Sequence, residues 1–336
     1  MRTRLRSEAG FSIAEMVIAT GLLLVVSSIV TSALLQMTNH QQTIWNRTEM
    51  HSGVRGATEL LQQEVGQAGR VTLPATVTLT NAIVSAAGTL CTLGTPTAGV
   101  YGVPVAATVS STTGMFVNEW LTTLDGDVSE TVRIETITSA TTITACFTQS
   151  HLATTTIRAL GGFATGIVAP SLANGSTANK LKLYGDINGD GTMVFIEYYC
   201  DNGDVGTAGS FNLYRNVVSP FVPFGAAAVA KPAYAASMVL LSNVHPNPAD
   251  TGGAARPCFQ YQEPVPASVA GMVLDVAVTL TVWTQTADPI THQFQTETKA
   301  LLNVSPRNVF FTWQFAGLNF MNRIQPTPTQ ITALLP

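Results

Sequence analysis

The loop from Asp186 to Thr192 has the residue types and spacing of a calcium site. The expected ligands are three side-chain oxygens and one backbone carbonyl oxygen, from Asp186, Asn188, Asp190 and Thr192. With Glu197 in twelfth position the pattern also fits an EF-hand loop. The segment Met193 to Tyr199 is β-branched and aromatic, however, and predicts a strand that carries Glu197 away from the loop. We expect a structural calcium ion held by the loop alone, with a solvated turn that binds no ion as the alternative.

A single carboxylate, Glu15, interrupts the most apolar stretch of the chain. The run from Phe11 to Met37 contains no other ionisable residue, and about 20 apolar residues in a helix cross a hydrocarbon core of ~30 Å. A carboxylate inside a bilayer costs several kcal/mol unless it is paired, so its presence indicates a function. We expect its partner to be the free amine of a neighbouring subunit. The alternative is an ordinary membrane anchor in which Glu15 lies near the lipid headgroups.

Four cysteines follow the apolar run and could form two disulfides. An even number of cysteines outside the cytoplasm favours disulfides, and no Cys-x-x-Cys spacing suggests a metal. Three connectivities exist. We favour Cys91 with Cys146 and Cys200 with Cys258, because each pair then joins predicted β segments without crossing the other. Buried free thiols are the alternative.

The sequence contains none of the local motifs that would indicate an enzyme. The five histidines are scattered, and there is no His-Glu-x-x-His helix, no Gly-x-Ser-x-Gly elbow and no phosphate-binding glycine loop. We therefore expect no catalytic activity and no required cofactor, with a membrane-anchored hydrolase built from distant segments as the alternative. The basic residues after the leader form no cluster, which disfavours a nucleic-acid partner.

The start of the chain resembles the prepilin signature of type IV pilins and type II secretion pseudopilins. A leader with three arginines ends at Gly10, Phe11 follows, and Glu15 is the fifth residue after the glycine. In that family a membrane peptidase cuts after the glycine and methylates the new amino terminus, and the helix later forms the filament core. The resemblance implies cleavage between Gly10 and Phe11, methylation of Phe11, and a role for Glu15 in docking onto the filament.

One long helix and a β-rich domain must position these residues. Apolar residues continue at helical spacing beyond the membrane-length run, at Met50, Val54, Ala57, Leu61, Val65 and Ala68. We expect one helix from Phe11 to Gly66, ended by Gly66 and Gly69. The predicted divisions are a leader (1–10), a transmembrane and filament-core helix (11–37), an amphipathic continuation (38–70) and an extracytoplasmic β-rich domain (71–336). The fold class is α+β, with the long helix packed on an antiparallel β-rich domain as in pilins.

Runs of β-branched residues broken by turn residues predict the strands of the β-rich domain. These runs are 75–80, 100–109, 132–137, 141–147, 193–199, 211–218, 273–285 and 294–304. Asp288-Pro289 should turn the chain between the last two, which form a hairpin. We expect the aromatic tail from Val309 to Ile324 to cover the sheet, with an exposed partner-binding patch as the alternative.

Three later segments resemble PilW-type minor pilins and the related pseudopilin J of type II secretion. They are Tyr184 to Thr192, Phe211 to Arg215 and Ser305 to Asn308. This resemblance implies a minor pilin of a type IV pilus, cut by prepilin peptidase and present in few copies in the tip or initiating complex that primes filament assembly. The alternatives are a type II secretion pseudopilin and an adhesive, ligand-binding tip subunit.

The partners that the resemblance implies are other pilin subunits, contacted through the N-terminal helix, prepilin peptidase and the inner-membrane assembly machinery. The arginines of the leader place the amino terminus in the cytoplasm. We therefore expect a single-pass protein of the inner membrane that later enters an extracytoplasmic filament.

Overall fold

The structure is a computed structural model that describes residues 10–84, 103–202, 211–250, 252–254, 256–264 and 271–336. The chain forms two compact units, residues 1–52 with 283–296 and residues 53–282 with 297–336. The long helix α1 (Ile13–Gln67) contributes to both units. The fold class is α+β, because a long apolar helix precedes a large part built from antiparallel sheets.

Helix α1 runs from Ile13 to Gln67, within two residues of the predicted limits. Gly69 terminates the helix two residues after Gln67, because its φ of 83° is the left-handed conformation that favours glycine. The predicted contribution of Gly66 is wrong, because that residue lies inside the last turn of the helix. The predicted apolar stripe is confirmed, since all six of its members are buried: Met50, Val54, Ala57, Leu61, Val65 and Ala68.

In the first unit, the segment 283–296 is hydrogen-bonded to the middle of α1. The hydroxyl of Thr43 donates to Asp288 Oδ2 at 3.0 Å, and the amide of Asn46 donates to Thr286 Oγ1 at 2.8 Å. The backbone N–H groups of Ile290 and Thr291 donate to Asp288 Oδ1 at 2.8 and 3.0 Å. Asp288 therefore closes the turn that the sequence predicts.

The second unit contains two large sheets. The six-stranded sheet has the order β1-β6-β3-β4-β5-β2, and its neighbouring strands run antiparallel. Its strands are β1 (Val77–Thr78), β2 (Val103–Thr108), β3 (Trp120–Leu124), β4 (Thr131–Ser139), β5 (Thr142–Phe147) and β6 (Thr156–Ala159). Its inward-facing side chains, such as Leu121, Ile134, Ile143 and Phe147, form a core of their own.

The seven-stranded sheet has the order β12-β13-β11-β10-β9-β8, with β14 paired to β13. Its strands are β8 (Lys180–Gly185), β9 (Val194–Cys200), β10 (Phe211–Val218), β11 (Val239–His245), β12 (Phe259–Gln262), β13 (Asp275–Trp283) and β14 (Thr296–Val304). The pairing of β13 with β14 confirms the predicted hairpin. Two short strands, β7 (Gly162–Phe163) and β15 (Ile324–Gln325), pair in parallel.

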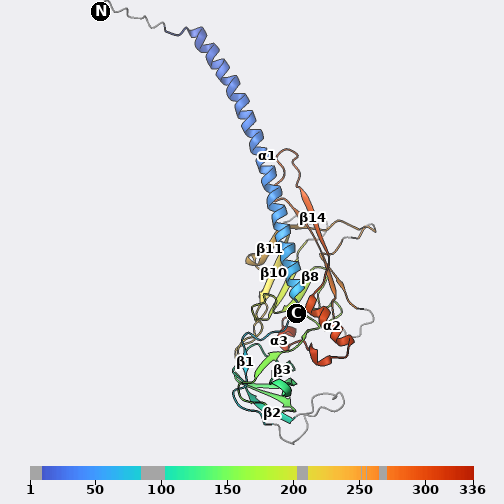
Figure 1. The fold of residues 1–336 in the computed structure, drawn as a ribbon. Coiled ribbons are helices and arrows are strands. Elements are labelled where there is room, and N and C mark those ends of the chain that lie inside the picture. The colour runs from blue at the N-terminus through green and yellow to red at the C-terminus, as the bar shows by residue number, and fades with distance from the viewer. Residues whose placement is uncertain (1–9, 85–102, 203–210, 251, 255, 265–270) are drawn as a thin grey trace, which may run out of the picture. The chain divides into compact units, whose positions relative to one another are not determined.

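Figure 1 shows the C-terminal turns of α1 beside β10 and β11 of this sheet. The fit is close, because a Cβ added at Gly53 would lie 3.3 Å from the side chain of Leu241 on β11. The predicted packing of the helix on a sheet is therefore confirmed. After β14 the chain forms α2 (Arg307–Gly317) and a final short helix, α3 (Thr329–Thr332).

All eight predicted runs contain a strand, but seven of the fifteen strands in the described part of the chain were not predicted from the sequence: β3, β6, β7, β8, β11, β12 and β15. Strands β3, β6 and β12 are short, with five, four and four residues. Strand β8 alternates Lys180 and Lys182 with leucines, and strong β formers are scarce in it. Pairing with β9, rather than local preference, makes this segment a strand.

Candidate functional site

The first part of α1 presents its apolar side chains to the outside. The large apolar residues from Phe11 to Met37 are all at least half exposed, and their exposed fractions lie between 51% at Val30 and 88% at Phe11. Among the described residues α1 is the one helix long and apolar enough to cross a membrane. Apolar side chains without protein neighbours require lipid or another protein around them.

Glu15 caps the first turn of α1. The backbone N–H of Ser12 donates to Glu15 Oε2 at 2.9 Å, and the backbone N–H of Ala14 donates to Ser12 Oγ at 3.1 Å. This is a capping box, in which a serine and a glutamate three residues later satisfy the free N–H groups at a helix start. The spacing Ser-x-x-Glu is visible in the sequence, but we predicted only a partner in a neighbouring subunit and missed the cap.

The predicted cleavage bond lies just outside this cap. Gly10 and Phe11 are exposed and precede the first helical residue, while residues 1–9 lie outside the described residues. A protease binds its substrate as an extended chain, so the position of this bond before the helix suits cleavage. Cleavage there would leave the new amino group one residue away from the Ser12 amide that Glu15 binds.

Two of the predicted calcium ligands, Asp186 and Asp190, have partners within the chain. Asp186 is buried; its Oδ1 accepts the Gly191 N–H at 3.3 Å, and its Oδ2 lies 3.4 Å from Nε of Arg70. Asp190 is exposed and its Oδ1 accepts the Thr192 N–H at 2.8 Å, while Asn188 is also exposed. Arg70 therefore supplies a positive charge to the carboxylate for which we expected a metal.

Glu197 lies on β9, as expected, and takes no part in this loop. Its Oε2 accepts a hydrogen bond from Lys231 Nζ at 3.0 Å, and its Oε1 accepts one from the hydroxyl of Tyr234. Over the described part of the chain, no three His, Cys, Asp or Glu side chains gather closely enough to hold a metal ion.

One of the two predicted disulfides is confirmed. Cys200, the last residue of β9, is bonded to Cys258, which immediately precedes β12, and their Cα atoms are 6.4 Å apart. The bond links two strands that are not neighbours in the order of the seven-stranded sheet. Cys146 lies on β5, but its predicted partner Cys91 is outside the described residues.

A buried carboxylate on α1, which we did not predict from the sequence, attaches the helix to the sheet. Glu64 accepts hydrogen bonds from the hydroxyl of Tyr198 on β9 and from the guanidinium of Arg215 on β10. Burial raises the pKa of Tyr198 well above its usual range, and the charge of Glu64 raises it further, so the hydroxyl remains a donor. The only sequence signal was an acid placed directly beside the stripe residue Val65.

A second buried network surrounds Glu197. Lys182 on β8 lies 3.6 Å from the same carboxylate that Lys231 and Tyr234 bind. Burial lowers the pKa of Lys182, whereas burial and the hydrogen bond to Glu197 raise that of Tyr234. These contacts fix the segment after β10 to the sheet, so the network serves the packing of the domain.

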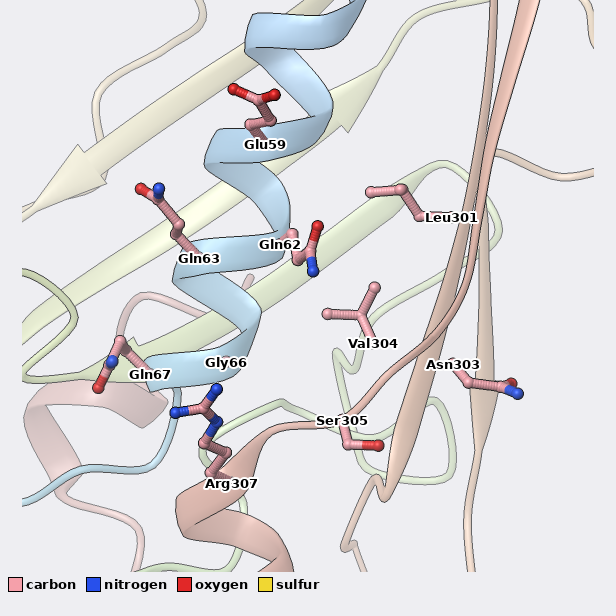
Figure 2. Close-up of a pocket in the computed structure, with 10 residues that line it drawn as sticks. All are labelled: Glu59, Gln62, Gln63, Gly66, Gln67, Leu301, Asn303, Val304, Ser305 and Arg307. Atoms are coloured by element: carbon pink, nitrogen blue, oxygen red, sulfur yellow. The ribbon is translucent and has the colours of Figure 1, made fainter.

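A groove of about 570 Å³ lies between α1 on one side and the end of β14 with the start of α2 on the other (Figure 2). Its helix wall consists of Glu59, Gln62, Gln63, Gly66 and Gln67, and its other wall of Leu301, Asn303, Val304, Ser305 and Arg307. Figure 2 shows Leu301 and Val304 pointing towards the helix and Asn303 pointing away. Glu59 is paired with Arg55 at 2.7 Å. Figure 2 shows Gln63 and Gln67 extending from the helix on the side away from the other wall.

The aromatic tail does not cover the sheet as predicted. Phe310, Phe311, Phe315 and Phe320 are exposed, while Val309 and Thr312 are the buried residues of α2. Trp313 packs partly against a small cluster of Ala164, Met272 and Val309. Val309, Thr312 and Trp313 attach this helix, so the prediction is wrong for the phenylalanines, and the exposed patch is the observed arrangement.

Comparison of the chain with protein-family models, with curated proteins and with solved structures found no match.

Proposed function

We propose that this chain is a minor pilin-like subunit of a type IV filament. The observation that carries the proposal is an exposed apolar helix that begins shortly after the Gly10–Phe11 bond and whose first turn is capped by the carboxylate of Glu15. In this function the helix is first held in the inner membrane and then packs among the helices of neighbouring subunits. The β-rich part stays outside the cytoplasm.

The exposure of the helix supports this proposal. None of its most apolar membrane-length window is buried by the chain itself. The same side chains can therefore be covered first by lipid and later by other apolar helices, because both environments remove them from water. A helix that only anchors a protein in the membrane needs lipid as its environment and has no need of contacts with other apolar helices.

The position of Glu15 is a second support. The capping box holds the carboxylate at the start of the helix, where a new amino group on Phe11 would be formed. A carboxylate and an ammonium group attract strongly in an apolar environment, and pairing removes the cost of burying either. The amine of a neighbouring subunit could form this pair during assembly.

The arginine-rich leader favours a cytoplasmic amino terminus before cleavage. The partners in this function are prepilin peptidase, the inner-membrane assembly machinery and other pilin subunits. The confirmed disulfide agrees with folding of the β-rich part in an oxidising compartment.

The proposal is tested by following the processing of the full chain. The protein is expressed with and without a prepilin peptidase, extracted from membranes and analysed by mass spectrometry. We expect a chain that starts at a methylated Phe11 only when the peptidase is present. Gly10→Val should block cleavage, whereas the matched control Gly21→Val, within the apolar part of α1, should be cut normally. An intact leader in the presence of peptidase, or a chain that starts after residue 30, would contradict the assignment.

A further inference from the structure

Helix α2 carries large apolar side chains on its exposed face as well as on its buried face. At 3.6 residues per turn, one side of the helix carries Val309, Thr312, Trp313 and Ala316, all of them buried or half-buried. The opposite side carries Arg307, Phe310, Phe311, Gln314, Phe315 and Leu318, all of them exposed. A surface helix that contacts only its own domain normally carries charged and polar residues on its outer face.

The exposed apolar residues continue into the turn after α2. Phe320 packs edge-on against Phe315 with ring centroids 6.4 Å apart, and the Phe320 N–H donates to the Phe315 carbonyl at 2.9 Å. Together these residues form what we call the aromatic surface: Phe310, Phe311, Phe315, Leu318, Phe320 and Met321. Their exposed fractions lie between 36% at Phe315 and 68% at Leu318. Contiguous exposed apolar residues of this kind mark an interaction site.

Two arginines flank the aromatic surface, and the same stretch of the chain contains no acidic residue. After Glu297 the remaining chain contains no acidic residue, but it contains Lys299, Arg307 and Arg323. Arg307 and Arg323 flank the surface, and both are exposed. Within the described part of the chain, neither guanidinium makes a hydrogen bond or an ion pair. The surface therefore fits a partner that is both apolar and anionic.

We propose that the aromatic surface binds an anionic phospholipid bilayer. Phenylalanine, leucine and methionine side chains enter the boundary between headgroups and acyl chains, while arginines at the rim contact lipid phosphates. A protein partner would have to combine an apolar face with an acidic rim, whereas an anionic bilayer combines both over its whole surface. This binding is additional to the membrane insertion of α1 and does not depend on filament assembly.

The test uses the full chain held in nanodiscs of phosphatidylcholine, so that α1 is already inserted. The loaded discs are mixed with vesicles of phosphatidylglycerol or of phosphatidylcholine and separated by flotation. We expect the discs to float with the phosphatidylglycerol vesicles only, and to float less as salt rises, because salt screens the arginines. In discs of phosphatidylglycerol, hydrogen exchange of residues 306–323 should be slower than in discs of phosphatidylcholine.

Substitutions separate this surface from the rest of the domain. The double variant Phe311→Ser, Phe315→Ser should weaken vesicle binding roughly tenfold or more, since two apolar side chains no longer enter the bilayer. Arg307→Gln with Arg323→Gln should weaken it roughly tenfold at low salt and little at high salt. The controls Phe224→Ser and Arg158→Gln change exposed residues of the same types elsewhere and should bind like the unchanged chain.

Two results would overturn the proposal. One is equal flotation with both lipids, or equal flotation of all variants, combined with unchanged exchange of residues 306–323 in both kinds of disc. The other is protection of these residues only when a second protein is added, which would assign the surface to a protein partner. Exchange in the rest of the domain shows whether each variant has folded.

Discussion

Glu64 on α1 and Arg215 on β10 form a largely buried ion pair, in which Nε of Arg215 lies 3.1 Å from Oε1 of Glu64. The second carboxylate oxygen accepts the hydroxyl of Tyr198 on β9. One acid on the helix is thus bonded to two neighbouring strands of the seven-stranded sheet. Its side chain is only 5% exposed, so water cannot replace a lost partner.

We predict that Glu64→Ala lowers the free energy of unfolding by about 3 kcal/mol or more, because it leaves the buried hydroxyl of Tyr198 and the largely buried guanidinium of Arg215 without their acceptor. The matched control is Glu59→Ala, an exposed acid on the same helix whose pair with Arg55 is screened by water and should contribute little. Urea unfolding of the full chain in detergent, followed by tryptophan fluorescence, measures both values. Equal losses for the two variants would show that Glu64 does not attach the helix to the sheet.

Substitutions at Ser12 and Glu15 should separate helix capping from filament assembly. Glu15→Gln keeps an oxygen that can accept the Ser12 N–H but removes the charge. We predict that this variant inserts and is cut normally yet is missing from sheared filaments. Ser12→Ala removes the other half of the cap, at a cost of about 1 kcal/mol to the helix start, and should still be incorporated. Immunodetection of each variant in the filament fraction measures its incorporation. Normal incorporation of Glu15→Gln would show that Glu15 only caps the helix.

The backbone amides of the turn at Asp288 should lose their protection from hydrogen exchange in acid. Hydrogen bonds from the backbone N–H groups of Thr291 and Ile290 lower the pKa of Asp288. A lowered pKa in the folded state means that the unfolded chain binds the proton more tightly. The stabilisation is therefore complete above the ordinary aspartate pKa of about 4 and is lost as the pH falls through the lowered value.

We predict that amide exchange of residues 284–295, corrected for its intrinsic pH dependence, becomes faster below about pH 4. Asp288→Asn mimics the protonated acid and should show the faster exchange already at neutral pH, with little further change in acid. Asp127→Asn, an exposed aspartate outside this turn, serves as the control. Exchange that is independent of pH in the unchanged chain would contradict the role of this carboxylate.

The loop Asp186 to Thr192 remains our predicted calcium site. The structure shows that Arg70 would compete with calcium for the carboxylate of Asp186. Arg70 already lies 3.4 Å from Asp186 Oδ2, so an ion must displace its guanidinium. We expect calorimetry of the full chain to show calcium binding that is lost in Asp186→Ala and becomes tighter in Arg70→Ala. Asp250→Ala is the matched control, because Asp250 closes a similar turn through the N–H groups of Gly252 and Ala254. No calcium heat, with an unfolding midpoint that a chelator leaves unchanged, would reject the site.

The sequence by itself determined the features that depend on local spacing. The stripe from Met50 to Ala68 recurs with the period of a helix, and α1 extends over it. Alternating residues predicted β13, and the Asp288-Pro289 turn predicted its hairpin with β14. The capping box of Ser12 and Glu15 is equally local, since both residues lie within one helical turn. Neighbours along the chain are sufficient to specify such elements.

Only the tertiary structure decided how polar and aromatic side chains far apart in the chain are used. Glu64 and Tyr198 are 134 residues apart, and they meet because β9 pairs beside β10 under the helix. The position of Arg70 beside Asp186 also results from contacts between segments far apart in the chain. The exposure of the phenylalanines of α2 likewise depends on which elements pack against that helix. The burial of these side chains depends on which elements become neighbours, and the free energy of that choice is summed over the whole core rather than stored in any short segment.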